Sequence, residues 1–133
     1  MKEYKVYVMN CNGTVIQWFK PGTNILHRED GPAVECSDGN KFKAWYKSGM
    51  RHRLDGPARE WYNGDKEWYQ NDKRHRLDGP AIERANGDKE WWIEGQEYSE
   101  KKFEAKITRR NQPPTFEGKV VVIDGKEYKL TLV

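Results

Sequence analysis

The sequence predicts a mainly β protein: a single-layer antiparallel β-meander built from repeats, with a short C-terminal helix and a terminal β-hairpin. Three observations support this fold class. The motif His-Arg-x-Asp-Gly-Pro-Ala begins at His27, His52 and His75. Asn-Gly or Asp-Gly pairs, the strongest short-range hairpin signals, separate short β-prone segments. The chain is 13% aromatic although 34% of its residues are charged, and disordered chains are poor in aromatic residues.

The composition predicts a thin fold whose apolar contacts come from aromatic rings. The 133 residues include only 35% hydrophobic residues, but they contain 6 Trp, 7 Tyr and 4 Phe. No apolar run approaches the roughly 18 residues of a membrane span, and the segment MKEYKVYVMN lacks the apolar stretch of a signal peptide. Cys11 and Cys36 have no metal-type spacing, which favours reduced thiols and a cytoplasmic location.

Each repeat is expected to contribute two strands and two turns. The second copy reads AREWY, NGD, KEWYQ and NDKR, and units begin near residues 27, 52 and 75. Residues upstream of His27 preserve the second half of an earlier unit. The predicted hairpin turns are Asn12-Gly13, Asp38-Gly39, Asn63-Gly64 and Asn86-Gly87. A unit of this size buries little apolar surface alone, so the units are expected to stack on their neighbours.

The repeat resembles the MORN (membrane occupation and recognition nexus) repeat. The matching segment is GDKEWYQNDKRHRLDGPA, and the resemblance covers roughly residues 12 to 98. The usual His-Gly-x-Gly is replaced here by His-Arg-x-Asp-Gly-Pro-Ala, so the chain is similar to a variant branch associated with bacterial and bacteriophage proteins. The resemblance implies an elongated antiparallel sheet that binds or scaffolds rather than catalyses.

The character of the sequence changes after residue 98, which predicts two regions: repeats over 1–98, and a capping helix with a hairpin over 99–133. Ser99 is the expected helix N-cap, Phe103 and Ile107 share one face, and Pro113-Pro114 ends the helix. The segment KVVVIDGKEYKLTLV predicts a hairpin with its turn at Asp124-Gly125. We expect this hairpin either to close the end of the meander or to pair with the N-terminal strand.

Residues that recur in every copy are expected to be structural. Equivalent positions in successive units lie about 10 Å apart, whereas zinc ligands lie within about 2.1 Å of one ion. His27, His52 and His75 should therefore hold no shared metal, and no cofactor is expected. The histidines and aspartates should join turns by hydrogen bonds instead. Glu35, Glu60 and Glu83 should form a ladder beside the arginines of adjoining turns.

Candidate binding residues come from three patterns. In each aromatic strand two adjacent rings point to opposite faces, so one stripe is expected to remain open for binding, unless Lys and Arg stems bury both stripes. Basic residues cluster on equivalent turns, and the second copy alone combines an Arg with a Trp-Tyr pair, which are typical interface anchors. The predicted binding residues are Arg59, Trp61, Tyr62, Tyr46, Tyr69, Trp92, Arg51, Arg53, Arg74 and Arg76.

The sequence favours a non-enzymatic binding protein. It contains no GxSxG, no phosphate-cradling loop and no HExxH motif. The leading hypothesis is recognition of a partner protein through an aromatic and basic sheet face, as in a phage-encoded inhibitor or adaptor of a host protein that acts in the host cytoplasm. One alternative is an anionic ligand, nucleic acid or nucleotide, on the basic turn edge and exposed rings. A second is a self-assembling scaffold, with a homodimer formed through the terminal strands.

Overall fold

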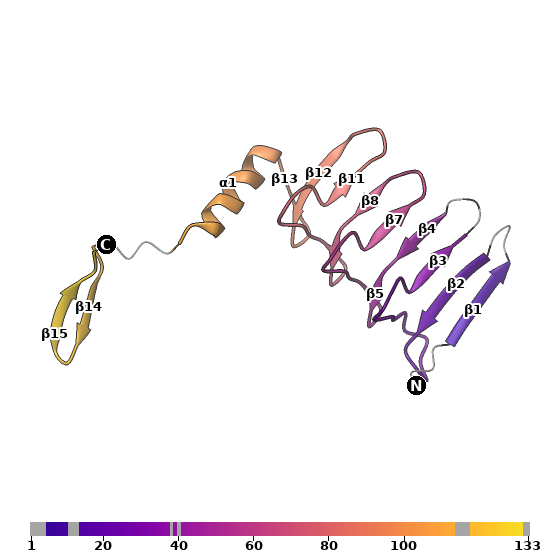
Figure 1. Ribbon diagram of the computed structural model, residues 1–133, viewed down its shortest axis with the longest axis horizontal. Coiled ribbons are helices and arrows are strands. Elements are labelled where there is room, and N and C mark those ends of the chain that lie inside the picture. The colour runs from indigo at the N-terminus through magenta and orange to yellow at the C-terminus, as the bar shows by residue number, and fades with distance from the viewer. Residues whose placement is uncertain (1–4, 11–13, 38, 40, 114–117, 132–133) are drawn as a thin grey trace.

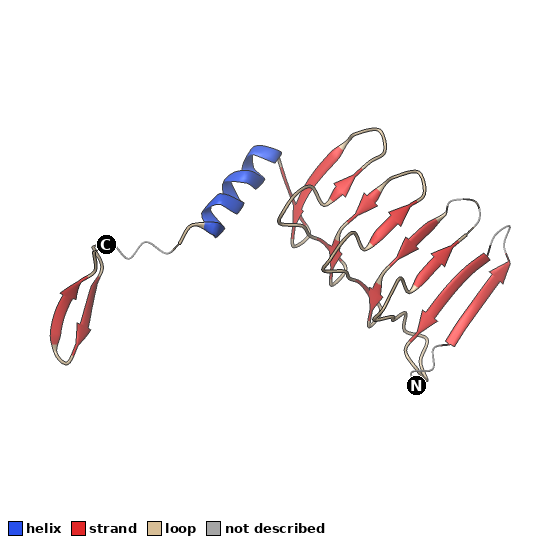
Figure 2. Ribbon diagram, in the orientation of Figure 1, coloured by secondary structure: helices blue, strands red, loops and turns tan. Residues whose placement is uncertain are grey.

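The computed structural model describes residues 5–10, 14–37, 39, 41–113 and 118–131. It shows a row of antiparallel hairpins followed by one helix and a hairpin that stands apart (Figures 1 and 2). The main sheet has nine strands in the order β1-β2-β3-β4-β7-β8-β11-β12-β13. The predicted β-meander with a short helix and a terminal hairpin is therefore confirmed.

Every strand of the main sheet pairs with its neighbours in this order, and all of these pairs are antiparallel. The strands are β1 (Lys5–Asn10), β2 (Thr14–Phe19), β3 (Val34–Cys36), β4 (Phe42–Ala44), β7 (Arg59–Trp61), β8 (Lys66–Glu67), β11 (Ile82–Glu83), β12 (Lys89–Ile93) and β13 (Gln96–Tyr98).

A second set of short hairpins lies beside the main sheet. β5 (Tyr46–Lys47) pairs with β6 (Met50–Arg51), and β9 (Tyr69–Gln70) pairs with β10 (Lys73–Arg74). Their two-residue turns have positive φ at both positions, as in Asn71 (49°) and Asp72 (63°), which is the type I′ conformation that matches the twist of the strands.

The predicted turns of the main sheet are confirmed where the structure describes them. Gly64 and Gly87 have φ of 100° and 94°, and the N–H of Gly64 donates to the carbonyl of Trp61 at 3.0 Å. Asn12-Gly13 and Asp38 lie outside the described residues.

The arginine of each His-Arg-x-Asp-Gly-Pro-Ala motif organises its unit. In the second copy the Arg53 guanidinium carbon lies 4.0 Å from the Trp45 ring centroid. Its Nε donates to Asp55 at 2.9 Å, and its Nη1 donates to the carbonyl of Pro57 at 3.2 Å and to Glu60 at 3.1 Å. A Cβ on Gly56 would lie only 2.9 Å from that guanidinium carbon. The guanidinium is thus held between an indole ring and a glycine.

The first and third copies repeat this arrangement. Arg28 lies 4.2 Å above the Trp18 ring and Arg76 lies 3.9 Å above the Trp68 ring. Arg76 also donates to Glu83 at 2.8 Å, so the predicted contact between the glutamate ladder and the arginines is confirmed. Along the sheet these glutamates alternate with lysines in one cross-strand row, Glu35, Lys43, Glu60, Lys66, Glu83 and Lys89, and opposite charges on facing strands stabilise the pairing.

The histidines join the motif turn at the start of each unit to a turn near the end of the same unit. Nδ1 of His27, His52 and His75 accepts the backbone N–H of Ser48, Asn71 and Glu94, at 3.0, 3.2 and 3.1 Å. Each acceptor therefore fixes the first residue of the type I′ turn near the end of its own unit. The predicted hydrogen-bonding role of the motif histidines is confirmed.

Small apolar side chains form the core where strands and motif turns meet. The motif alanines, Ala33, Ala58 and Ala81, are fully buried, as is Ile82. The carbonyl of Ala58 accepts the N–H of Trp45 at 2.8 Å, so the alanine backbone also holds the aromatic strand in place. A thin fold of this kind has room for alanine but not for larger side chains at these positions.

The helix α1 (Glu100–Asn111) follows the last strand of the main sheet. Ser99 is its N-cap and accepts the N–H of Lys102 at 3.4 Å, as predicted. Phe103 is buried, and α1 contacts β12 and β13. The helix therefore covers part of the end of the repeat array.

The terminal hairpin of β14 (Val120–Ile123) and β15 (Lys126–Lys129) turns at Asp124-Gly125, as predicted. It forms a two-stranded sheet of its own. The expectation that it closes the meander or pairs with the N-terminal strand was wrong. At one end of the sheet α1 takes the covering position by contacting β12 and β13, and at the other end β1 pairs with β2 alone among the described strands.

Candidate functional site

A cluster of aromatic and basic side chains lies where the first and second copies meet. Phe42 of β4 pairs directly with Trp61 of β7, and Cys36 of β3 pairs with Phe42. A cavity of about 410 Å³ opens here, and the residues around it define the aromatic-basic patch: Cys36, Lys41, Phe42, Lys43, Glu60, Trp61 and Tyr62.

Backbone contacts position the outermost ring of this patch. The N–H of Tyr62 donates to the carbonyl of Lys41 at 2.8 Å, and the N–H of Trp61 donates to the carbonyl of Asp65 at 3.0 Å. The Lys41 ammonium lies 5.3 Å from the Tyr62 ring centroid. The backbone of Tyr62 is thus fixed by the sheet, and its ring contacts Lys41 while the residue is 84% exposed.

Arg59 contacts two aromatic rings of the patch. Its guanidinium carbon lies 4.3 Å from the Trp61 ring centroid and 5.2 Å from that of Phe42. Cation–π contacts of this geometry restrain both rings. Three of the predicted binding residues, Arg59, Trp61 and Tyr62, are therefore brought together, with Arg59 acting as a support for the other two.

Sequence reasoning missed the contribution of the first copy to this patch. Phe42 stands where the other two copies have Asp65 and Asp88, and the register of β4 against β7 places it opposite Trp61. The signal was present, because only one copy has a ring at that position. Recognising it required the strand register, which the spacing of the repeats alone does not give.

In the predicted stripe of Tyr46, Tyr69 and Trp92, arginines lie over the second and third rings. Tyr69 is only 5% exposed, and the Arg51 guanidinium carbon lies 4.1 Å from its ring centroid. Arg74 lies 4.9 Å from the Trp92 ring centroid. The structure therefore agrees with the alternative that arginine side chains bury this stripe in part.

Arg51, Arg53, Arg74 and Arg76 lie on the basic turn edge, as predicted, but three of them are paired with carboxylates. Arg51 Nε donates to Asp72 at 2.8 Å. Hydrogen bonds from Arg53 and Arg76 lower the pKa of Asp55 and of Asp78 below the ordinary value. Arg74 instead donates to the Tyr69 hydroxyl at 3.4 Å. Most of the positive charge on this edge is therefore balanced by carboxylates of the same chain.

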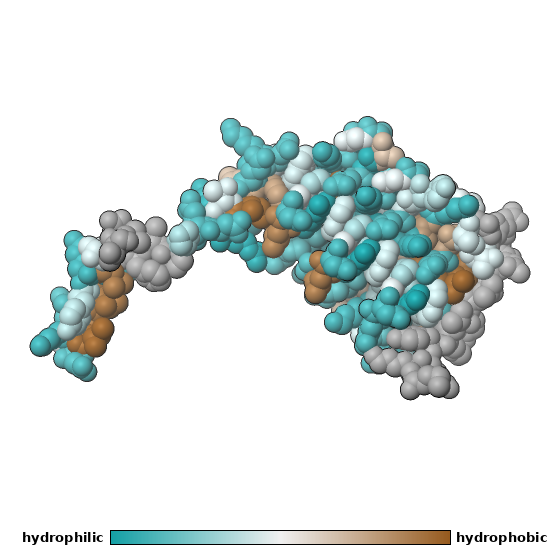
Figure 3. Space-filling model, viewed as in Figure 1, coloured by the Kyte–Doolittle hydropathy of each residue, from teal (hydrophilic) through white to brown (hydrophobic). Residues whose placement is uncertain are grey.

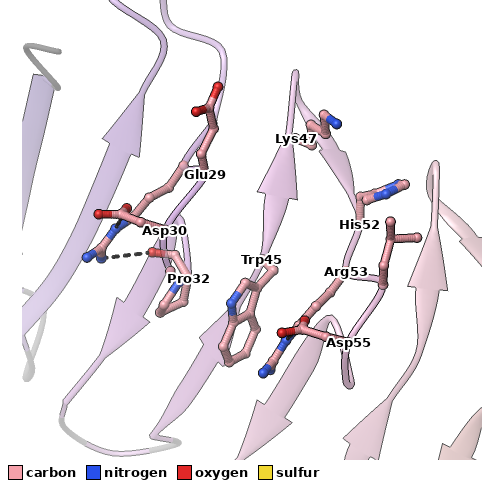
Figure 4. A pocket seen from close by; sticks show the side chains of 11 residues that line it. Glu29, Asp30, Pro32, Trp45, Lys47, His52, Arg53 and Asp55 are labelled. Atoms are coloured by element: carbon pink, nitrogen blue, oxygen red, sulfur yellow. Dashed lines mark hydrogen bonds and ion pairs between the residues drawn. The ribbon is translucent and has the colours of Figure 1, made fainter.

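Two similar grooves lie between successive motif turns. The first, of about 620 Å³, includes Trp45, His52 and Arg53 in its lining, and Figure 4 shows these side chains on the motif turn and the adjoining strand. The second, of about 590 Å³, repeats it one unit later with Trp68, His75 and Arg76. Because their polar groups are the same ones that tie the units together, we assign these grooves to the scaffold.

A further groove of about 550 Å³ lies against α1, lined by Tyr98, Lys102, Ala105, Lys106 and Arg109. The Lys106 ammonium lies 5.3 Å from the Tyr98 ring centroid. The three cations of this groove have no ion pair with any residue in the described part of the chain.

The described residues contain no group of three or more His, Cys, Asp or Glu side chains arranged to hold a metal ion. They also contain no helix with the length and hydropathy of a membrane span.

Comparisons with protein-family models, with curated proteins and with solved structures find no match to this chain. The resemblance to the MORN repeat therefore stays a prediction, and the function is argued from the site itself.

Proposed function

We propose that this chain is a non-catalytic, repeat-built binding protein that recognises a partner protein through the aromatic-basic patch. The observation that carries the proposal is Tyr62, a large ring that contacts Lys41 yet is 84% exposed beside a cavity lined by Phe42 and Trp61. Interface hot spots are enriched in Trp, Tyr and Arg and centre on pockets of this kind.

The difference between copies supports the same proposal. Positions equivalent to Trp61 and Tyr62 hold Cys36 and Ser37 in the first copy, and Arg84 and Ala85 in the third. The repeat therefore folds without rings at these two positions. Since the scaffold does not require them, we attribute the Trp-Tyr pair to binding.

The ion pairs of the motif arginines favour a protein over a phosphate-containing molecule as the ligand. Arg53 and Arg76 each donate to two carboxylates and a carbonyl, so their capacity for phosphate is already occupied. Together with the resemblance to bacteriophage repeat proteins, this supports an inhibitor or adaptor of a host protein in the host cytoplasm.

The test uses a variant that copies the third repeat into the second. The double substitution Trp61→Arg/Tyr62→Ala places there the residues found at 84 and 85, so the fold should be kept. A tagged pull-down from bacterial lysate is run at low and high salt with the wild type and this variant. We expect one protein that is retained by the wild type at high salt and lost by the variant.

The matched control is Leu54→Glu, which removes a 76% exposed apolar side chain from the motif turn and copies Glu29 of the first unit. This variant should retain the partner. Equal capture by Trp61→Arg/Tyr62→Ala and the wild type would refute the role of the patch.

A second candidate function, binding of nucleic acid or a nucleotide, is supported by the groove against α1. Lys102, Lys106 and Arg109 surround Tyr98 there, and a ring beside cations suits a base and its phosphate. Affinity of this origin falls steeply with salt. Recovery of nucleic acid alone, lost at high salt and abolished by Lys102→Glu/Lys106→Glu, would favour this function over the first.

A further inference from the structure

The terminal hairpin exposes several large apolar side chains on a sheet of only two strands. Val120, Val122, Ile123 and Tyr128 are each between 49% and 64% exposed, and Figure 3 shows apolar side chains in a continuous stripe along the hairpin. A lone hairpin is at best marginally stable, and a third strand or a packed face is needed for independent stability. The hairpin therefore lacks the additional strand or packed face that would stabilise it.

The hydrogen bonding of the hairpin identifies which backbone groups are open. Asp124 and Gly125 form a type I′ turn, with φ of 49° and 74°, so Ile123 and Lys126 form a hydrogen-bonded pair. The N–H of Leu130 donates to the carbonyl of Lys119 at 2.9 Å, which agrees with this alternation. The backbone N–H and C=O groups of residues 119, 121 and 123 thus face β15, whereas those of Val120 and Val122 point away from it.

We propose that a second copy of this chain pairs with that open edge. Two β14 strands run antiparallel about a twofold axis at Val121, and Val120 of each copy exchanges hydrogen bonds with Val122 of the partner subunit. The result is a continuous four-stranded sheet with β14 strands at its centre and β15 strands outside.

The edge of β14 is self-complementary in this register. Both residues that supply backbone groups are valine, and the residue on the twofold axis faces its own copy. Cross-strand pairs of β-branched residues are favourable, and no charge is buried among them. Twofold symmetry makes the interface isologous, so the assembly closes as a dimer.

The other edge of the hairpin is unsuited to the same role. On β15 the residues opposite Val120 and Val122 are Lys129 and Glu127, and charged side chains on an edge strand are a common protection against pairing. The proposal therefore assigns the contact to β14 specifically, and it stands independently of the proposed partner protein.

The test removes one outward N–H without touching the hairpin's own hydrogen bonds. Val122→Pro deletes an N–H that only the partner would use, because proline is tolerated where the N–H of an edge strand faces solvent. Glu127→Pro is the matched control, since Glu127 pairs with Val122 and its N–H points to the opposite edge. Sedimentation equilibrium of the full chain is measured over a range of concentrations.

We expect the wild type and Glu127→Pro to approach twice the mass of one chain as concentration rises, and Val122→Pro to have a dimer dissociation constant at least about tenfold higher. A wild type that stays monomeric at millimolar concentration overturns the proposal. Loss of the dimer in Glu127→Pro, or its persistence in Val122→Pro, likewise removes the contact from β14.

A cross-linking experiment gives a second reading that does not depend on proline. In a background with Cys11→Ser and Cys36→Ser, Val121→Cys places one thiol opposite its copy in a non-hydrogen-bonded pair, where the Cα separation suits a disulfide. Tyr128→Cys, on the facing position of β15, is the control. Under mild oxidation Val121→Cys should form a covalent dimer and Tyr128→Cys should not, and the reverse result would contradict the proposed register.

Discussion

The contact between Gly56 and the Arg53 guanidinium offers a sharp test of how a unit is held together. A Cβ at Gly56 would lie 2.9 Å from Arg53 Cζ and 3.1 Å from its Nε. Since the φ of Gly56 is not in the left-handed region, alanine is compatible with the backbone here. Any cost of Gly56→Ala must therefore come from displacing the guanidinium.

The size of that cost follows from the contacts that the guanidinium would lose. Its stacking on Trp45 contributes about 1 kcal/mol. Its bonds to the Pro57 carbonyl and to Glu60 contribute about 1 kcal/mol more, whereas the pair with the highly exposed Asp55 contributes little. We expect Gly56→Ala to lower the free energy of unfolding by about 2 kcal/mol, measured by urea denaturation followed by tryptophan fluorescence.

The control is the same substitution without the arginine. In an Arg53→Ala background the new methyl group has nothing to displace, and Gly56→Ala should then be neutral or stabilise by about 0.4–1 kcal/mol, because alanine restricts the unfolded chain. If Gly56→Ala costs as much in this background as in the wild type, the glycine serves some purpose other than making room for the guanidinium.

Three further predictions concern the hydrogen bonds and the core of the array. Burial lowers the pKa of His75 below 6.5, so below that pH the unfolded chain binds more protons than the folded chain, and stability should fall between pH 7 and pH 5. His75→Gln, measured by denaturation at the two pH values, should reduce this dependence. An unchanged dependence would point to other groups. Ala58 is 0% exposed, so Ala58→Val should overpack the core at a cost of about 1–3 kcal/mol, and a rise in midpoint denaturant concentration would contradict this packing. Phe103→Ala should cost about 3 kcal/mol and loosen α1, which hydrogen exchange at the helix amides would detect; unaltered exchange would mean that the helix is held by other contacts.

The sequence was sufficient to predict the architecture because the determinants of a meander are local. Hairpin turns, strand lengths and the helix cap each depend on a few adjacent residues, as at Asn63-Gly64 and Ser99. The repeated motif also indicated correctly that its histidines and glutamates serve the scaffold.

The same sequence was less informative about which side chains are open to a partner. Arg53 and Arg76 were predicted to bind, but their partners in the fold lie two to seven residues away and became evident only when the chain had turned at Asp-Gly-Pro. Tyr69 is covered by Arg51, a residue of the preceding unit. Contacts between units depend on register, which composition and spacing do not specify.

The position of the terminal hairpin illustrates a second limit. Its turn was predicted correctly from Asp124-Gly125, yet its place relative to the sheet was not, because a turn signal is local and does not say which edge, if any, the hairpin joins.

The stacking of each motif arginine on the tryptophan of the preceding unit has an evolutionary consequence. A whole unit can be duplicated or deleted and the flanking units will still meet a compatible neighbour, since each boundary joins the same guanidinium to the same indole ring. Residues of a single copy that the framework does not use, such as Trp61 and Tyr62, can then change while the other copies preserve the framework.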